Sequence, residues 1–167
     1  FTNYSVIPEI TTASQQVEIS SFRLRKDDGN EVNATYANPE NTESVNAFIP
    51  GSKIRLRFAV ANTGSSVATK SYRIEYSNRE CSVWNPVPRP VNSILEPWRI
   101  EPSQFVADGS LTTQSGGVTP SSGKSFVAGR LMTFNNQTPP ITLSPNQYTE
   151  IEYSLRSTPK LQPFMPY

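Results

Sequence analysis

One stretch, KIRLRFAVANTG at residues 53–64, constrains the fold of this 167-residue chain more than any other. Apolar side chains alternate there with charged or small ones, which is the period-two pattern of a half-buried β-strand. Burying the four large apolar side chains contributes about 6 to 12 kcal/mol before the chain entropy is subtracted. We therefore predict the central strand of a sheet, with these residues facing the core: Ile54, Leu56, Phe58 and Val60.

A partner strand is expected directly after this stretch. Asn62, Thr63 and Gly64 accept left-handed backbone angles, so the chain should reverse there and pair with residues 72–76. Arginines lie on the faces that we predict to point outward, and they form a candidate basic patch. We interpret them as members of cross-strand pairs on a solvated face, together with one glutamate. The residues concerned are Arg55, Arg57, Arg73 and Glu75.

Composition narrows the class of protein. Fifteen prolines argue against long helices, and apolar residues make up 35% of a chain in which only 17% of residues are charged. A formal net charge of +1 supplies no basic field for nucleic acid or for an anionic membrane surface. No apolar run reaches the length of a membrane-spanning helix. We expect a soluble, strand-rich domain with no nucleic-acid partner and no membrane insertion.

The residues that most enzymes use are scarce. The sequence has no histidine, which removes the commonest general base and metal ligand, so we predict no enzymatic activity and no cofactor. Glu150 and Glu152 lie about 7 Å apart on one strand face, a spacing compatible with glycosidase chemistry, but no aromatic sugar platform lies nearby. The single Cys81 is interpreted as a small buried residue; the alternative is half of a bridge whose other half is on another chain or on a missing segment.

Further strands follow from the same pattern. Across Ser20 and Ser21 the apolar positions change from Val17 and Ile19 to Phe22 and Leu24, as at a β-bulge. Residues 85–123 are rich in proline, serine and glycine, and we expect a long ordered excursion with Trp98 and Phe105 packed onto the body. The predicted strands, besides the two above, are 17–25, 31–37, 45–49, 126–132, 141–143 and 148–156. This makes an all-β, immunoglobulin-like antiparallel β-sandwich with no internal repeat.

Five segments carry a family resemblance: FRLRKDDGNEVNATYA, IRLRFAVANTG, YRIEYS…CSVW, KSFVAGRLM and YTEIEYSLRST. They resemble the immunoglobulin-like repeats of large secreted bacterial surface proteins, over roughly residues 17–158. In that family the TEIEYS strand is followed by a strand of the form YCFRVTNAG, which carries a cysteine, and then by a closing strand similar to YTVYPEIT. The present sequence ends at Tyr167 before either, while its opening residues NYSVIPEIT look like that closing strand moved to the front. The resemblance also implies that a partner cysteine for Cys81 lies in the absent strand.

The displaced strand predicts a division of the chain into a donor strand at 1–11, a linker at 12–16 and a sandwich at 17–167. Pro8 confines the first strand to a sheet edge or a bulge. A sandwich without its last strands exposes unpaired backbone groups, and a strand from the next molecule would fill that groove. Insertion into its own domain and truncation of a longer protein remain alternatives. The predicted assembly residues are Tyr4, Val6, Ile7 and Ile10.

Two weaker kinds of site remain. Oxygen ligands gather at residues 27–31, where calcium is one interpretation and an ordinary tight turn the other. The candidate ligands are Asp27, Asp28, Asn30 and Glu31. Asn-X-Ser/Thr sequons, which are either glycosylation sites or plain surface asparagines, occur at Asn3, Asn33 and Asn136.

Taken together, these features predict a structural subunit of an extracellular, cell-surface filament. Identical subunits would be joined head to tail by strand donation, because an open heterologous contact generates a fibre. The alternative is a monomeric adhesive or ligand-binding module that uses the loop at 85–123 to recognise other cell surfaces.

Overall fold

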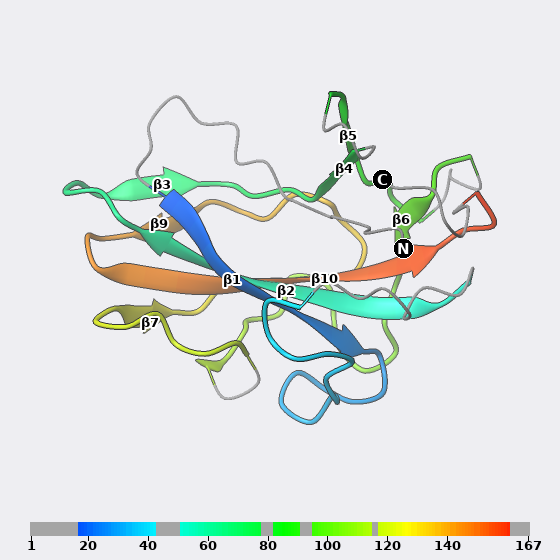
Figure 1. Ribbon diagram of the computed structural model, residues 1–167, viewed down its shortest axis with the longest axis horizontal. Coiled ribbons are helices and arrows are strands. Elements are labelled where there is room, and N and C mark those ends of the chain that lie inside the picture. Colours follow the sequence, from blue (N-terminus) through cyan, green and yellow to red (C-terminus); the bar gives the residue numbers. More distant parts are fainter. Residues whose placement is uncertain (1–16, 43–50, 78–81, 91–94, 115–116, 161–167) are drawn as a thin grey trace.

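The computed structural model describes residues 17–42, 51–77, 82–90, 95–114 and 117–160. These residues form an all-β fold with ten strands and no α-helix (Figure 1). None of them belongs to a helix long and apolar enough to cross a bilayer. The predicted donor strand at 1–11, the linker at 12–16, the strand at 45–49 and Cys81 lie outside the described residues.

The first layer is organised around strand β2 (Lys53–Asn62). It pairs antiparallel with β1 (Val17–Lys26) on one edge and with β10 (Gln147–Ser157) on the other, so it is the central strand that the sequence predicts. The far edge of β10 takes three short strands. One is antiparallel, β6 (Trp98–Ile100), and two are parallel, β7 (Ser125–Val127) and β8 (Leu131–Met132).

The second layer is built along residues 68–77. Strand β3 (Ala68–Lys70) pairs with β9 (Ile141–Leu143), and β4 (Glu75–Ser77) pairs with β5 (Trp84–Pro86). In Figure 1, β3 and β4 follow one another along the upper side of the molecule, above β2 and β10. The two layers enclose one large apolar cluster, which gives the fold its sandwich-like character.

The predicted core face is confirmed. The four large apolar residues of β2 all belong to the main cluster, as do Ile151, Tyr153 and Leu155 of β10. The predicted β-bulge is also present, because the register of β1 shifts between Ile19 and Ser21. The shift lets apolar residues before and after it reach the same core: Val17, Ile19, Phe22 and Leu24.

The predicted hairpin between β2 and residues 72–76 is wrong. Both edges of β2 are occupied, by β1 and β10, so no edge is left for a third partner. The chain instead crosses to the second layer after Asn62, whose side-chain amide donates to the carbonyl oxygens of Ser66 and Leu143, at 2.9 Å each. Tyr72, Ile74 and Tyr76 are still buried in the core, but from the opposite layer.

Three smaller expectations need correction. The predicted strand at 126–132 is divided into β7 and β8, and the predicted return strand at 31–37 contains a turn and one isolated bridge, Arg25 to Tyr36. In the 85–123 segment Trp98 is fully buried in the core, as expected, whereas Phe105 is 38% exposed. Trp98 is held because β6 adds a rung to β10, and Phe105 has no such neighbour in a described strand.

Candidate functional site

The polar face of the first layer is buried, which overturns the prediction of a solvated face for Arg55 and Arg57. Arg73, in the second layer, is exposed as predicted, but its ion pair is with Glu75 of the same segment, and Glu75 is buried. Arg25, Arg55 and Arg57 have no exposed surface, and Glu150 and Glu152 have at most 1%. Alternation brings these side chains to one face, because every second residue of β1, β2 and β10 points there. The face is closed by the loops that follow β1 and precede β7.

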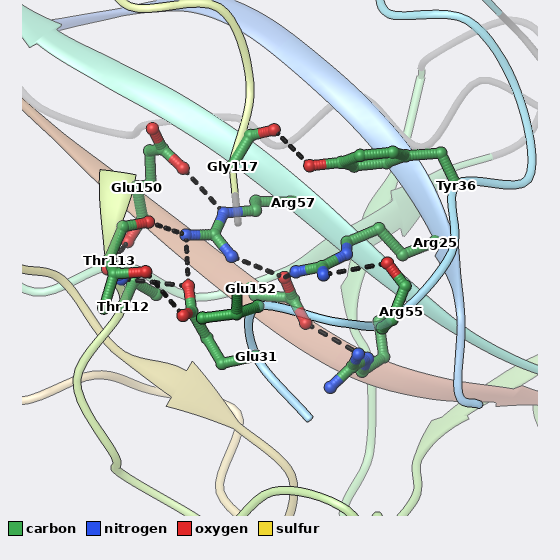
Figure 2. Close-up of polar contacts among 12 residues, drawn as sticks. Arg25, Glu31, Tyr36, Arg55, Arg57, Thr112, Thr113, Gly117, Glu150 and Glu152 are labelled. Carbon is green, nitrogen blue, oxygen red and sulfur yellow. Dashed lines mark hydrogen bonds and ion pairs between the residues drawn. The ribbon is translucent and has the colours of Figure 1, made fainter. Parts of the chain in front are cut away.

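A network of ion pairs neutralises this charged layer (Figure 2). Arg57 donates from Nε to Glu150 Oε2 at 2.7 Å and from Nη1 to Glu152 Oε2 at 3.0 Å. Arg25 Nη1 donates to the same Glu152 oxygen at 3.0 Å, and Arg55 Nε lies 3.2 Å from Glu152 Oε1. Charges taken out of water are tolerated only when paired in this way.

The covering loops complete the layer. Glu31 Oε1 lies 2.8 Å from Arg57 Nη2, and both Glu31 oxygens accept hydrogen bonds from Thr113. The Tyr36 hydroxyl donates to the Gly117 carbonyl at 2.5 Å, while the Arg23 guanidinium stacks 3.5 Å above the Tyr36 ring. These contacts tie two distant parts of the chain over the charged face (Figure 2).

The pKa shifts follow from burial and pairing. Burial raises the pKa of Glu150, and the neighbouring Arg57 only partly offsets this. Burial would lower the pKa of Arg57, but Glu152 and Glu150 outweigh it, so the net shift is upward. Burial would raise the pKa of Glu31, yet its bonds to Thr113 and Arg57 lower it overall.

The geometry of this layer does not fit the glycosidase alternative. A glycosidase needs two carboxyl groups that face a substrate, and Glu150 and Glu152 both point into a sealed layer of arginines. Gly117 lies so close to Glu150 that an added Cβ would meet its Oε2 at 1.5 Å, so the cover leaves no room beside that carboxylate. The network therefore supports the sheet and its covering loops.

The candidate calcium ligands do not converge. Asp27 Oδ1 accepts from Ser103 Oγ, Asp28 accepts from Thr35, Asn30 Oδ1 accepts from two amides of its own turn, and Glu31 reaches Thr113. Within the described ranges no three acidic, cysteine or histidine side chains are grouped to hold a metal. The residues satisfy the local turn and anchor it to neighbouring loops.

The sequons differ in their surroundings. Asn33 is exposed, and Asn3 lies outside the described residues. The Asn136 side chain instead takes part in the second layer: Nδ2 donates to the carbonyl oxygens of Ile74 and Val87, and Oδ1 accepts from the Ile74 amide. It joins β5 and the segment before β9 to the same side of residues 68–77, and a glycan on Nδ2 would disrupt this junction.

The other side of residues 68–77 has a different character. The Thr138 amide donates to the Tyr72 carbonyl, and the Val87 amide donates to the Ile74 carbonyl. Tyr72 and Ile74 therefore direct their backbone polar groups toward the side of the segment where β9 and β5 lie. By alternation the intervening residues direct their N–H and C=O groups the opposite way. Those groups have no backbone partner among the described residues. We call this the open edge, formed by Thr69, Ser71, Arg73 and Glu75.

The edge of β1 is mostly closed by comparison. Lys26 donates to the Thr35 carbonyl, while Ala37 and Asn41 donate to the carbonyls of Leu24 and Phe22, so residues 35–41 cover its second half. Only the start of β1, before the bulge, lacks such a cover within the described part of the chain. Val17 there and Ala68, the residue next to Thr69 of the open edge, belong to the same apolar cluster.

The sequence contained a partial signal for the charged layer. IRLRF and TEIEYS place basic and acidic residues at every second position of two strands, a complementary pattern. Arg25 has the same alternation in FRLRK, but nothing in the sequence showed that its strand would lie beside β2. The covering role of Glu31 had no signal, because it depends on how the loops fold over the sheet. The open edge could not be predicted either, because it also depends on which strands become neighbours.

Comparisons with known proteins add nothing to this geometry, because no family model, curated protein or solved structure matches the chain.

Proposed function

We propose that this chain is the structural subunit of an extracellular surface filament, assembled when residues 1–11 of one subunit add a strand to the next. The observation that carries the proposal is the open edge, which spans residues 69–75, about 23 Å at 3.3 Å per residue, and has no backbone partner among the described residues. An unpaired edge beside an apolar core is a template for an incoming strand.

The N-terminal sequence fits such an edge. NYSVIPEIT alternates apolar with polar residues except at Ile7, contains one proline, and is followed by the polar stretch TASQQ, which serves as a linker. In this proposal the two layers form an immunoglobulin-like sandwich that another molecule completes. Each subunit offers one strand and one edge, so the contact is heterologous and repeats into a fibre.

Removing the N-terminal strand tests the proposal. The full chain at high concentration is expected to form ordered fibres in electron micrographs, and a chain that lacks residues 1–11 is expected to sediment as a folded monomer. Circular dichroism of the shortened chain checks that it retains its β-structure. Dispersed monomers of the full chain, or fibres of the shortened one, would overturn the proposal.

A monomeric binding module is the second candidate, because large apolar side chains are exposed along the 85–123 segment. Leu95, Phe105 and Leu111 are 70%, 38% and 55% exposed. Surface apolar residues of this kind serve recognition when they gather on loops. Binding to cells by a monomer that forms no fibres, lost when these three residues are replaced by serine, would favour this function.

A further inference from the structure

We infer that the incoming N-terminal strand runs antiparallel to the open edge. This direction rests on the proposed function, and it follows from how side chains and backbone groups alternate along residues 68–77. Thr69, Ser71 and Arg73 direct their backbone groups outward from the layer and carry exposed side chains. Ala68, Tyr72 and Ile74 direct their backbone groups toward the paired side of the segment, where β9 and β5 lie, and their side chains are buried in the core.

The two possible directions place different side chains in the core. In an antiparallel pair, residues that bond to each other lie directly opposite, and their side chains share one face. An incoming residue that bonds to Ser71 would then expose its side chain, as Ser71 does. In a parallel pair the hydrogen bonds are slanted, so a residue bonds to the two neighbours of the residue directly opposite it. The side chains of those neighbours lie on the other face of the sheet. An incoming residue that bonds to the edge would then point its side chain toward the core.

Pro8 distinguishes the two directions. The apolar face of the N-terminal strand carries Tyr4, Val6, Pro8 and Ile10, and we assign this face to the core. In the antiparallel arrangement the bonding residues are Ser5, Ile7 and Glu9, and each has an amide proton. In the parallel arrangement Pro8 would be among the bonding residues, where it has no N–H to donate. Only the antiparallel direction therefore combines an apolar inner face with an unbroken ladder.

Disulfide trapping reads the direction without assuming a register. In a full-length chain with Cys81→Ser, one cysteine is placed at Ser5, Ile7 or Glu9 and a second at Thr69, Ser71 or Arg73, which gives nine variants. All six positions are predicted or observed on the outer face. A disulfide forms only when the two Cα atoms lie about 4.4 to 6.8 Å apart, so each N-terminal position has one preferred partner.

The antiparallel direction predicts that the preferred partner moves backward along the edge, from Arg73 toward Thr69, as the N-terminal cysteine moves from residue 5 to residue 9. Non-reducing gels should show ladders of linked subunits. The matched control is Thr142→Cys on β9, which has an exposed side chain in the same layer but lies beyond β3, about 10 Å from the incoming strand. It should give no ladder.

Each other outcome contradicts a distinct statement. If the preferred partner moves forward along the edge, the strand is parallel and this inference fails while the filament stands. If disulfides form only within single chains, the strand inserts into its own domain and the proposed function fails. Fibres that give no disulfide in any of the nine variants would show that the open edge is not the acceptor, and both this direction and this site would be abandoned.

Discussion

Strand β2 and residues 68–77 are separated by only a few residues of sequence, yet their surroundings differ. Strand β2 has both edges paired and both faces buried, one against apolar side chains and one against ion pairs. Residues 68–77 have one edge paired, one open edge, and exposed side chains at Thr69, Ser71 and Arg73. The comparison suggests two separate roles: we expect substitutions in the first layer to change stability, and we propose that the edge of the second layer is where subunits associate.

Substitutions in β2 should have the largest effect on stability. Arg57→Ala leaves Glu150 and Glu152 buried without their main partner, and the expected loss is about 3 to 5 kcal/mol of unfolding free energy. Phe58→Ala on the opposite face should cost a similar amount, about 3 to 5 kcal/mol, by opening a cavity. Urea unfolding monitored by circular dichroism measures both changes.

The matched control for Arg57 is Arg156→Ala on β10. Its ion pair with Glu101 is partly exposed, and exposed pairs contribute about 1 kcal/mol or less. If Arg57→Ala were no more harmful than Arg156→Ala while Phe58→Ala remained severe, the charged face of β2 would be solvated after all.

The junction at Asn136 should give an intermediate effect. Asn136→Asp removes both hydrogen bonds that the amide donates, to the carbonyls of Ile74 and Val87, and the expected loss is about 1 to 3 kcal/mol. Asn33→Asp is the control, because that side chain is exposed. Equal urea midpoints for the two variants would mean that the paired side of residues 68–77 does not depend on this amide.

The pH dependence of Glu31 should be smaller. Its pKa is held below the ordinary value of 4.5 because hydrogen bonds from Thr113 and the Arg57 charge outweigh the effect of burial. A lowered pKa contributes stability above the unfolded-state value, and that contribution disappears as the pH falls through the folded-state value. The stability gap between the native chain and Glu31→Gln should therefore be widest near neutral pH and should narrow below about pH 4.5. A gap that widens on acidification would contradict this sign.

The open edge should respond in association and hardly at all in stability. Ser71→Pro removes an N–H group that faces away from β9, so the free energy of unfolding should change by about 1 kcal/mol or less. Fibre formation in electron micrographs should fail, because the incoming strand loses a rung. Ser71→Val, which keeps the N–H, is the control. If Ser71→Pro assembles like Ser71→Val, the comparison between a closed interior and an associating edge is wrong.

The core residues could be predicted from the sequence wherever the alternation of apolar residues along a strand is sufficient to identify them. The apolar faces of β2 and β10 and the bulge in β1 follow from local patterns, and all are present. The burial of Arg55 and Arg57 could not be predicted, because charged residues alternate with apolar ones along a strand in the same way whether water or a loop covers the charged face. The partner of residues 72–76 was not readable either, since that pairing depends on β1 and β10 occupying β2 first.

The same limit applies to the candidate sites. Asp27, Asp28, Asn30 and Glu31 form a polar cluster in the sequence, and only the neighbouring loops show that each is already engaged. Asn136 fits a sequon by its neighbours in sequence, whereas its hydrogen bonds are made to residues 49 and 62 positions away.

The most direct test of strand donation is to mix the full chain with the chain that lacks residues 1–11. The shortened subunit keeps an acceptor edge but has no strand to donate, so it should end each fibre that it joins. Mean fibre length in electron micrographs should fall steadily as its fraction rises. If fibre length stays constant while circular dichroism shows that the shortened subunit is folded, the subunits are not joined by this strand.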